Sequence, residues 1–138
     1  MEKIVNVWFE KGRIFIMTDN GETYSRPLEA FPTLKEAGER ERQDFKIGRF
    51  GDDIRWETLD EDIHITNFYE TAEPNPENEV GHIFRQFPQL NVSEMAKYIG
   101  INKSLLAKYI YGIKKPSPER LQQIKYAIHT FGEKLVAV

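Results

Sequence analysis

Apolar and polar residues alternate along the start of the chain, which is typical of β-strands. Residues 4–9 and 13–18 follow this pattern, and the second run is rich in β-branched and aromatic side chains. Asn20-Gly21 predicts a tight hairpin turn into a third strand over residues 22–26, because both residues tolerate positive φ. The sequence therefore predicts three antiparallel strands at the start.

The rest of the first half predicts one helix and a second hairpin. Thr33 can cap a polar helix over residues 34–44, which would lay one edge on the sheet. Residues 45–57 predict the hairpin, and residues 59–69 begin with acidic residues and can end as a short helix or an extended tail. We therefore expect an antiparallel sheet with one helix over residues 1–71.

A change of pattern follows a segment with two prolines and no large apolar residue. We expect residues 72–78 to be a linker. Beyond it the apolar residues recur at helical spacing, which predicts an all-helical domain over residues 79–138. Four helix starts are predicted by their capping residues, at Asn78, Asn91, Asn102 and Ser117. The pattern does not define the conformation of residues 132–138. The whole chain is expected to be α+β.

Residues 92–111 (VSEMAKYIGINKSLLAKYIY) predict two short helices joined by a tight turn. Gly100 lies at the turn, where positive φ is needed, and the small Ala96 would let the helices approach. The expected inward positions are Met95, Ile99, Ile101, Leu106 and Tyr109. This arrangement predicts a helix-turn-helix, whose second helix commonly enters the DNA major groove.

The outward positions of that second helix are the candidate DNA contacts. At 100° per residue, Ser104, Lys108 and Tyr111 point away from Leu106, as does Ala107. We expect bases to meet Lys103, Ser104 and Lys108, and phosphates to meet Tyr111, Lys114 and Lys115. Ala107 would allow close approach or contact a thymine methyl. The alternative is an ordinary helical hairpin with a solvated lysine face.

Charge is divided along the chain, which has a net charge of -3. Residues 1–77 hold 10 Lys+Arg and 18 Asp+Glu, a net of -8, and residues 78–138 hold 9 and 4, a net of +5. The predicted helix-turn-helix lies in the basic half. A positive charge is what binding to a phosphate backbone requires.

The segment GINKSLLAKYIYGIKKPSPERL resembles the phage-repressor-like DNA-binding domain of the lambda and Cro type, over about residues 79–131. The resemblance implies that Lys103, Ser104 and Lys108 face the groove. Ile110 stands where that family often has an acidic residue, and Leu105 where it usually has a small polar one. Leu105 therefore leaves open a contact with another protein surface.

The segments FIMTDNGETY, FPTL and GDDIRWETLDEDI, within residues 3–69, resemble a small bacterial α/β domain family of unknown function. Members of that family are commonly encoded beside toxin-antitoxin-like partners, and some carry a C-terminal helix-turn-helix. The resemblance implies a regulatory or antitoxin-like context, without a defined chemistry.

Enzyme chemistry is not expected from this sequence. The chain has no cysteine, no phosphate-binding glycine loop and no paired nucleophile and base. Asp60, Glu61, Asp62 and His64 suggest a metal site, but three adjacent carboxylates cannot all face one ion on a regular element. We therefore expect no metal, no cofactor and no catalytic residue.

The lack of cysteine, of a signal-peptide pattern and of an apolar run of about 20 residues leads us to expect a cytoplasmic protein. Its expected function is that of a DNA-binding transcriptional regulator or antitoxin-like repressor. The alternative is a protein–protein interaction module that keeps the fold and does not bind DNA. Expected partners are double-stranded DNA, a second copy of the chain, and a toxin-like or other protein at the acidic domain, with no membrane.

Overall fold

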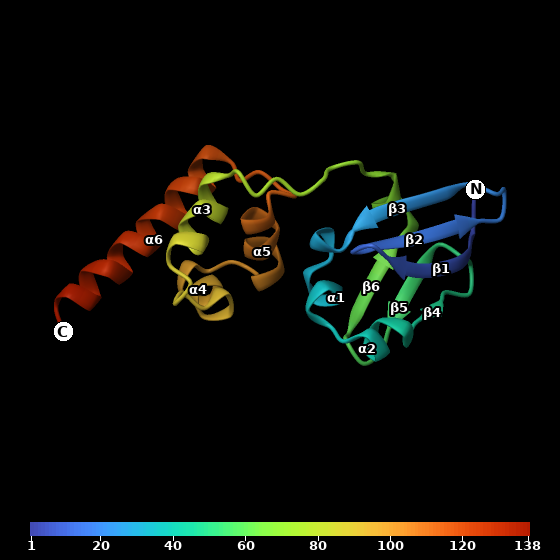
Figure 1. Ribbon diagram of the computed structural model, residues 1–138, viewed down its shortest axis with the longest axis horizontal. Helices are drawn as coiled ribbons and strands as arrows, with labels where there is room; N and C mark the ends of the chain where they lie inside the picture. The colour runs from blue at the N-terminus through green and yellow to red at the C-terminus, as the bar shows by residue number, and fades with distance from the viewer. The chain divides into compact units, whose positions relative to one another are not determined.

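Two antiparallel sheets of three strands each form the first part of the chain in the computed structural model, which describes residues 1–138 (Figure 1). The strands are β1 (Ile4–Glu10), β2 (Arg13–Thr18), β3 (Thr23–Pro27), β4 (Lys46–Ile47), β5 (Asp53–Trp56) and β6 (Glu61–His64). Strands adjacent in sequence are adjacent in each sheet. The predicted opening meander is confirmed, with Gly21 at a φ of 84° in the turn that joins β2 to β3.

The core of this first part draws on both sheets. Ile14 and Ile16 of β2 are fully buried, as are Ile54 and Trp56 of β5. The indole N–H of Trp56 donates to the Arg42 carbonyl oxygen at 2.9 Å, so the polar end of this buried side chain is satisfied.

The single helix predicted over residues 34–44 is wrong in its extent. The chain instead forms a short 3-10 turn, η1 (Leu28–Ala30), followed by α1 (Pro32–Glu36) and α2 (Glu39–Gln43). Gly38 separates the two helices because its backbone is extended, with φ -74° and ψ 164°. The helix begins at Pro32, one residue before the expected cap Thr33, because proline is favourable at the first helical position.

Residues 59–69 end as a short helix, which is one of the two expected alternatives, but the strand that precedes this helix was not expected. The hairpin over residues 45–57 forms as β4 and β5, and β6 adds a third strand whose Ile63 is buried. A 3-10 helix, η2 (Ile65–Tyr69), follows.

The second part of the chain is entirely helical, so the predicted α+β class with a C-terminal helix-turn-helix is confirmed. Its helices are α3 (Glu79–Gln86), α4 (Val92–Ile99), α5 (Lys103–Tyr111) and α6 (Pro118–Val136). All four predicted caps form, and each side chain accepts a hydrogen bond from a backbone N–H in the first turn. Residues 132–136 continue α6. No helix is both long and apolar enough to cross a membrane.

The first two residues of the segment expected to be a linker, Ala72 and Glu73, are held by the N-terminal unit. The chain divides into an N-terminal unit, residues 1–73, and a C-terminal unit, residues 74–138. Within the N-terminal unit, Glu73 forms a bidentate pair with Arg13 at 2.6 and 3.1 Å. Arg26, which is almost completely buried, donates to the Ala72 carbonyl oxygen at 2.7 Å. The last residues of this unit are therefore fixed by two arginines of its first sheet.

Candidate nucleic-acid interface

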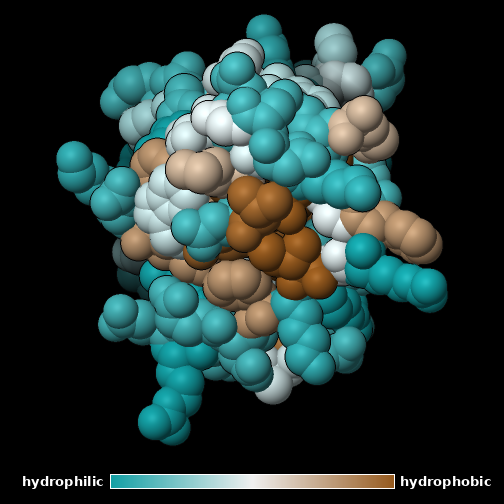
Figure 2. Space-filling model, turned by 90° about the vertical axis from the view of Figure 1, so that its right-hand side faces the viewer, coloured by the Kyte–Doolittle hydropathy of each residue, from teal (hydrophilic) through white to brown (hydrophobic).

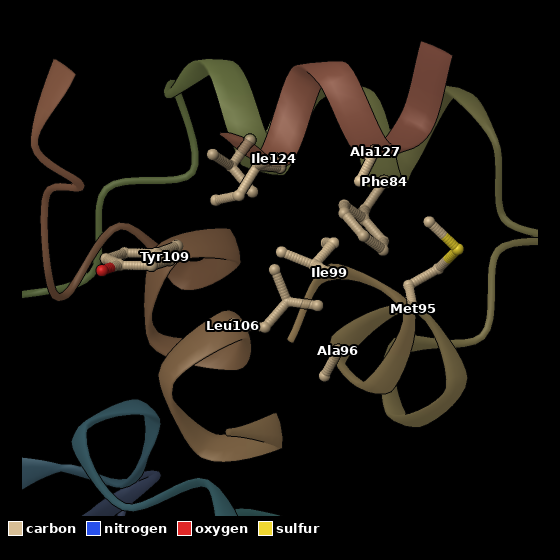
Figure 3. Close-up of a cluster of buried hydrophobic side chains, with 9 residues drawn as sticks. Phe84, Met95, Ala96, Ile99, Leu106, Tyr109, Ile124 and Ala127 are labelled. Atoms are coloured by element: carbon tan, nitrogen blue, oxygen red, sulfur yellow. The ribbon is translucent and has the colours of Figure 1, made fainter. Parts of the chain in front are cut away.

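Helices α4 and α5 pack through small and apolar side chains (Figure 3). Leu106 is fully buried, and Ala96 faces it with only 1% of its surface exposed. Met95, Ile99 and Tyr109 are buried as predicted, and Ile101 is half-buried against the same core. The core therefore holds α5 by one side and leaves the other side available.

The turn between the two helices is closed by its own backbone. Gly100 adopts a φ of 91°, and the amides of Gly100 and Ile101 both donate to the Ala96 carbonyl oxygen, at 2.8 and 3.0 Å. The side chain of Asn102 then accepts from the Ser104 amide at 2.7 Å. These contacts stop α4 and start α5 within three residues, which fixes the direction of α5.

The outward side of α5 carries the residues expected to contact DNA. Ser104, Lys108 and Tyr111 are spaced i, i+4 and i+7, so they form one stripe opposite Leu106, and all three are half-buried. Lys103, the first residue of α5, is exposed beside this stripe. The structure therefore brings these four residues to one surface.

Lys114 and Lys115 lie in the loop that follows α5, and both are exposed. The amides of Ile113 and Lys114 donate to the Lys108 carbonyl oxygen, so this loop is folded back on the end of the helix. Ion pairs of the C-terminal unit engage Lys97 and Lys125, whereas Lys108, Lys114 and Lys115 form none. The three ammonium groups therefore remain available for an anionic partner.

Two other positions on α5 differ from expectation. Ala107 is only 5% exposed, so it does not offer its methyl group to a DNA base. A methyl group is easily covered by the longer side chains around it on a helix. Leu105 is partly buried against the core of the same unit, which accounts for an apolar residue at that position without a second protein.

Sequence reasoning missed how the C-terminal end of α5 is held. Residues 75–78, here called the strap, cap that end. The Asn75 amide donates to the Tyr111 carbonyl oxygen at 2.9 Å, and the Asn78 side chain donates to the Ile110 carbonyl oxygen at 3.1 Å. Asn78 also caps α3 through the Gly81 amide. Two asparagines flanking Pro76 were the available clue, since asparagine side chains often satisfy nearby backbone groups.

Gly112 shows how closely the strap approaches α5. This residue ends α5 with a φ of 75°, and a Cβ added to it would lie 2.0 Å from the Asn75 carbonyl oxygen. Only glycine fits both the backbone conformation and the available space. The strap is therefore part of the helix-turn-helix unit.

Comparisons with known proteins follow the same division of the chain. Residues 4–74, about half of the chain, match the family described as "Protein of unknown function (DUF2442)". The chain belongs to this family. Residues 84–124 match the family described as "Helix-turn-helix", which confirms the resemblance of this part of the DUF2442 protein to the lambda-repressor-like helix-turn-helix domain.

A solved structure from Nitrosomonas europaea, described as "Putative DNA Binding Protein NE0471", is similar to this chain at 14% sequence identity. The similarity covers 90% of this chain and 84% of the other, with a TM-score of 0.37. No curated protein matches the DUF2442 chain.

The acidic run of the DUF2442 part is organised around an arginine. Arg55 donates to Asp60 at 2.8 Å and to Asp62 at 2.9 Å, and Glu57 lies 3.4 Å away. The hydrogen bond that Arg55 donates to Asp60 is the main reason that the pKa of Arg55 is raised. No group of three His, Asp or Glu side chains in the chain is arranged to hold a metal ion.

Asn102 allows the stability of α5 to be separated from its electrostatics. Asn102→Ala removes the cap, so we expect it to destabilise the C-terminal unit by about 0.5–2 kcal/mol. Asn102→Asp keeps the cap and adds a negative charge at the helix end expected to meet DNA, so we expect near-normal stability and weaker DNA binding. Helical circular dichroism during urea unfolding and fluorescence anisotropy with labelled DNA measure the two effects. Equal DNA affinity for Asn102→Asp and the wild type would contradict this assignment.

Proposed function

We propose that this protein binds double-stranded DNA as a transcriptional regulator, with α5 in the major groove. Lys103, Ser104 and Lys108 would contact bases, and Tyr111 would donate to a phosphate. The observation that carries this proposal is the outward surface of α5, where Ser104, Lys108 and Tyr111 form a stripe opposite a well-packed core and Lys103 lies beside it. Lysine can donate to guanine acceptors or to phosphates, and serine can bond to several base edges.

The charge of the C-terminal unit supports the same proposal. Residues 74–138 hold 9 Lys+Arg and 5 Asp+Glu, a net of +4, whereas residues 1–73 hold 10 and 17, a net of -7. Lys114 and Lys115 follow directly on α5, where they would contact phosphates and set the register of the helix.

The N-terminal unit suits a protein partner, which would fit an antitoxin-like repressor in the cytoplasm. Figure 2, which faces this unit, shows apolar residues gathered in one patch with hydrophilic residues around it. Exposed apolar side chains of the unit include Val5, Met17 and Phe50. An apolar patch with a polar rim is a common feature of protein interaction sites. The net negative charge favours a partner with a basic surface.

Salt dependence tests the proposal most directly. We expect the full-length protein to bind DNA from its own upstream region, and its affinity to fall steeply between about 50 and 200 mM salt, because lysine–phosphate contacts release counterions. Titrations by fluorescence anisotropy at several salt concentrations measure the slope. Absence of salt-sensitive binding would contradict DNA recognition and favour a protein–protein interaction module.

A further inference from the structure

A hollow of about 470 Å³ lies in the C-terminal unit, between the strap and the loop that follows α5. Pockets that bind small molecules have volumes of this order. Its apolar lining includes Val80 of α3, Tyr109 of α5 and Leu121 of α6. Three helices of the helix-turn-helix unit therefore meet at the hollow, and its wall is built by packed helices as well as by loops.

The hydroxyl group of Tyr109 is the unusual polar feature of this wall. The side chain of Tyr109 is only 5% exposed and packs in the core, yet its hydroxyl makes no hydrogen bond with the rest of the chain. In Figure 3 the hydroxyl oxygen lies at the end of the ring that points away from Leu106 and Ile99. A buried tyrosine usually finds a hydrogen-bond partner for its hydroxyl. Because Tyr109 lines the hollow, a molecule inside the hollow can supply that partner.

Two lysines give the hollow a positive charge. Lys114 and Lys115 both line it, and neither forms an ion pair. The lining also contains two acidic residues, of which Glu79 is paired with Lys125, whereas Glu77 has no ion pair. Two unpaired ammonium groups and one unpaired carboxylate leave a single positive charge, which favours a ligand with a single negative charge.

We propose that this hollow binds a small organic acid. Its apolar part would lie against Val80 and Leu121, its carboxylate would contact Lys114 and Lys115, and the Tyr109 hydroxyl would donate to one of its oxygens. The regulatory consequence rests on the proposed function, in which the same two lysines contact DNA phosphates. The acid and DNA would then compete for these lysines, and each would lower the affinity for the other by the same factor.

Hexanoate, acetate and hexanol are probes that separate the two parts of the ligand. In nuclear magnetic resonance spectra of the full-length protein, we expect hexanoate to shift the amide signals of Gly112, Lys114 and Lys115 until they saturate. Its affinity should exceed that of acetate and that of hexanol by at least about tenfold, because acetate lacks the apolar chain and hexanol lacks the charge. Absence of saturable shifts at these residues, or equal affinities for the three probes, would overturn the proposal.

Tyr109→Phe tests the position of the acid, because it removes the hydroxyl and keeps the packed ring. We expect the affinity for hexanoate to fall about two- to tenfold with the loss of one hydrogen bond. Tyr126→Phe is the matched control, because Tyr126 is 70% exposed on α6 and does not line the hollow. Circular dichroism shows whether each variant is folded. Equal affinities of the two variants would overturn the placement of the acid in this hollow.

DNA titrations followed by fluorescence anisotropy test the competition, with acetate at the same concentration as the control for ionic strength. Saturating hexanoate should weaken DNA binding by at least about fivefold more than acetate does. Unchanged DNA affinity in the presence of bound hexanoate would overturn the competition. A protein that binds hexanoate in the hollow but binds no DNA would instead contradict the proposed function and leave the ligand site intact.

Discussion

Replacing both Lys103 and Lys108 with alanine is expected to lower affinity for a specific DNA site by a few kcal/mol at most. Each well-placed base contact is worth about 1–3 kcal/mol of discrimination against the wrong base. The loss should be larger on the specific site than on unrelated DNA, because base contacts carry the sequence information. Anisotropy titrations on both DNA sequences at one salt concentration measure the difference.

Two further double variants separate base contacts from charge. Lys114→Ala with Lys115→Ala should weaken binding about equally on every sequence and reduce the salt slope by about 2, close to one unit per lost phosphate contact. Lys125→Ala with Lys134→Ala removes the same charge from α6, where one lysine pairs with Glu79 and the other stacks on Tyr98. If this α6 variant loses as much affinity for the specific site as the variant with Lys103→Ala and Lys108→Ala, binding reflects net charge, and α5 does not read bases.

The parts of the fold that follow from local chemistry were predictable from the sequence. Asn20-Gly21 is a hairpin turn whatever surrounds it, because the turn itself demands positive φ. The caps of α3 to α6 were predictable for the same reason, since each is a contact within three residues. The core of the helix-turn-helix follows from helical spacing, because the positions predicted to face inward are buried or half-buried in the structure.

The parts that were missed depend on contacts distant in sequence, with Gly38 as an exception. Strand β6 has one buried apolar residue, Ile63, and forms because it pairs with β5 and brings Asp62 to Arg55. Its own sequence, EDIH, contains two acidic residues and a single apolar one, so it does not predict a strand by itself. Gly38 was a local signal that was overlooked, because glycine inside an otherwise helical segment is a probable break.

Part of the candidate site was predictable because it depends only on local helical geometry. The stripe of Ser104, Lys108 and Tyr111 follows from helical geometry, and the structure places these residues as expected. The strap could not be derived from periodicity, because it joins Asn75 and Asn78 to carbonyl groups more than 30 residues away. Its contacts satisfy carbonyl groups at the last turn of α5, which would otherwise need water or another partner.

Gly112→Ala is expected to destabilise the C-terminal unit by about 2–3 kcal/mol. Alanine in the left-handed region costs roughly 1–2 kcal/mol, and losing the bond from Asn75 to Tyr111 costs about 1 kcal/mol more. The added Cβ would lie 2.0 Å from a backbone oxygen, so the strap must move away from α5. Urea unfolding followed by helical circular dichroism measures the loss in the C-terminal unit. Both tryptophans lie in the N-terminal unit, so their fluorescence reports the unfolding of that unit separately.

Gly100→Ala is the matched control, because it separates backbone strain from the close approach of the strap. Gly100 has a φ of 91° and ends α4, but a Cβ added there meets nothing within 4 Å. The control variant should therefore lose only the conformational cost of about 1–2 kcal/mol. Equal losses for the two variants would show that the strap contributes nothing to stability. A larger loss for Gly112→Ala would mean that residues 75–78, which precede the part matched to the helix-turn-helix family, help to hold the helix that we propose enters DNA.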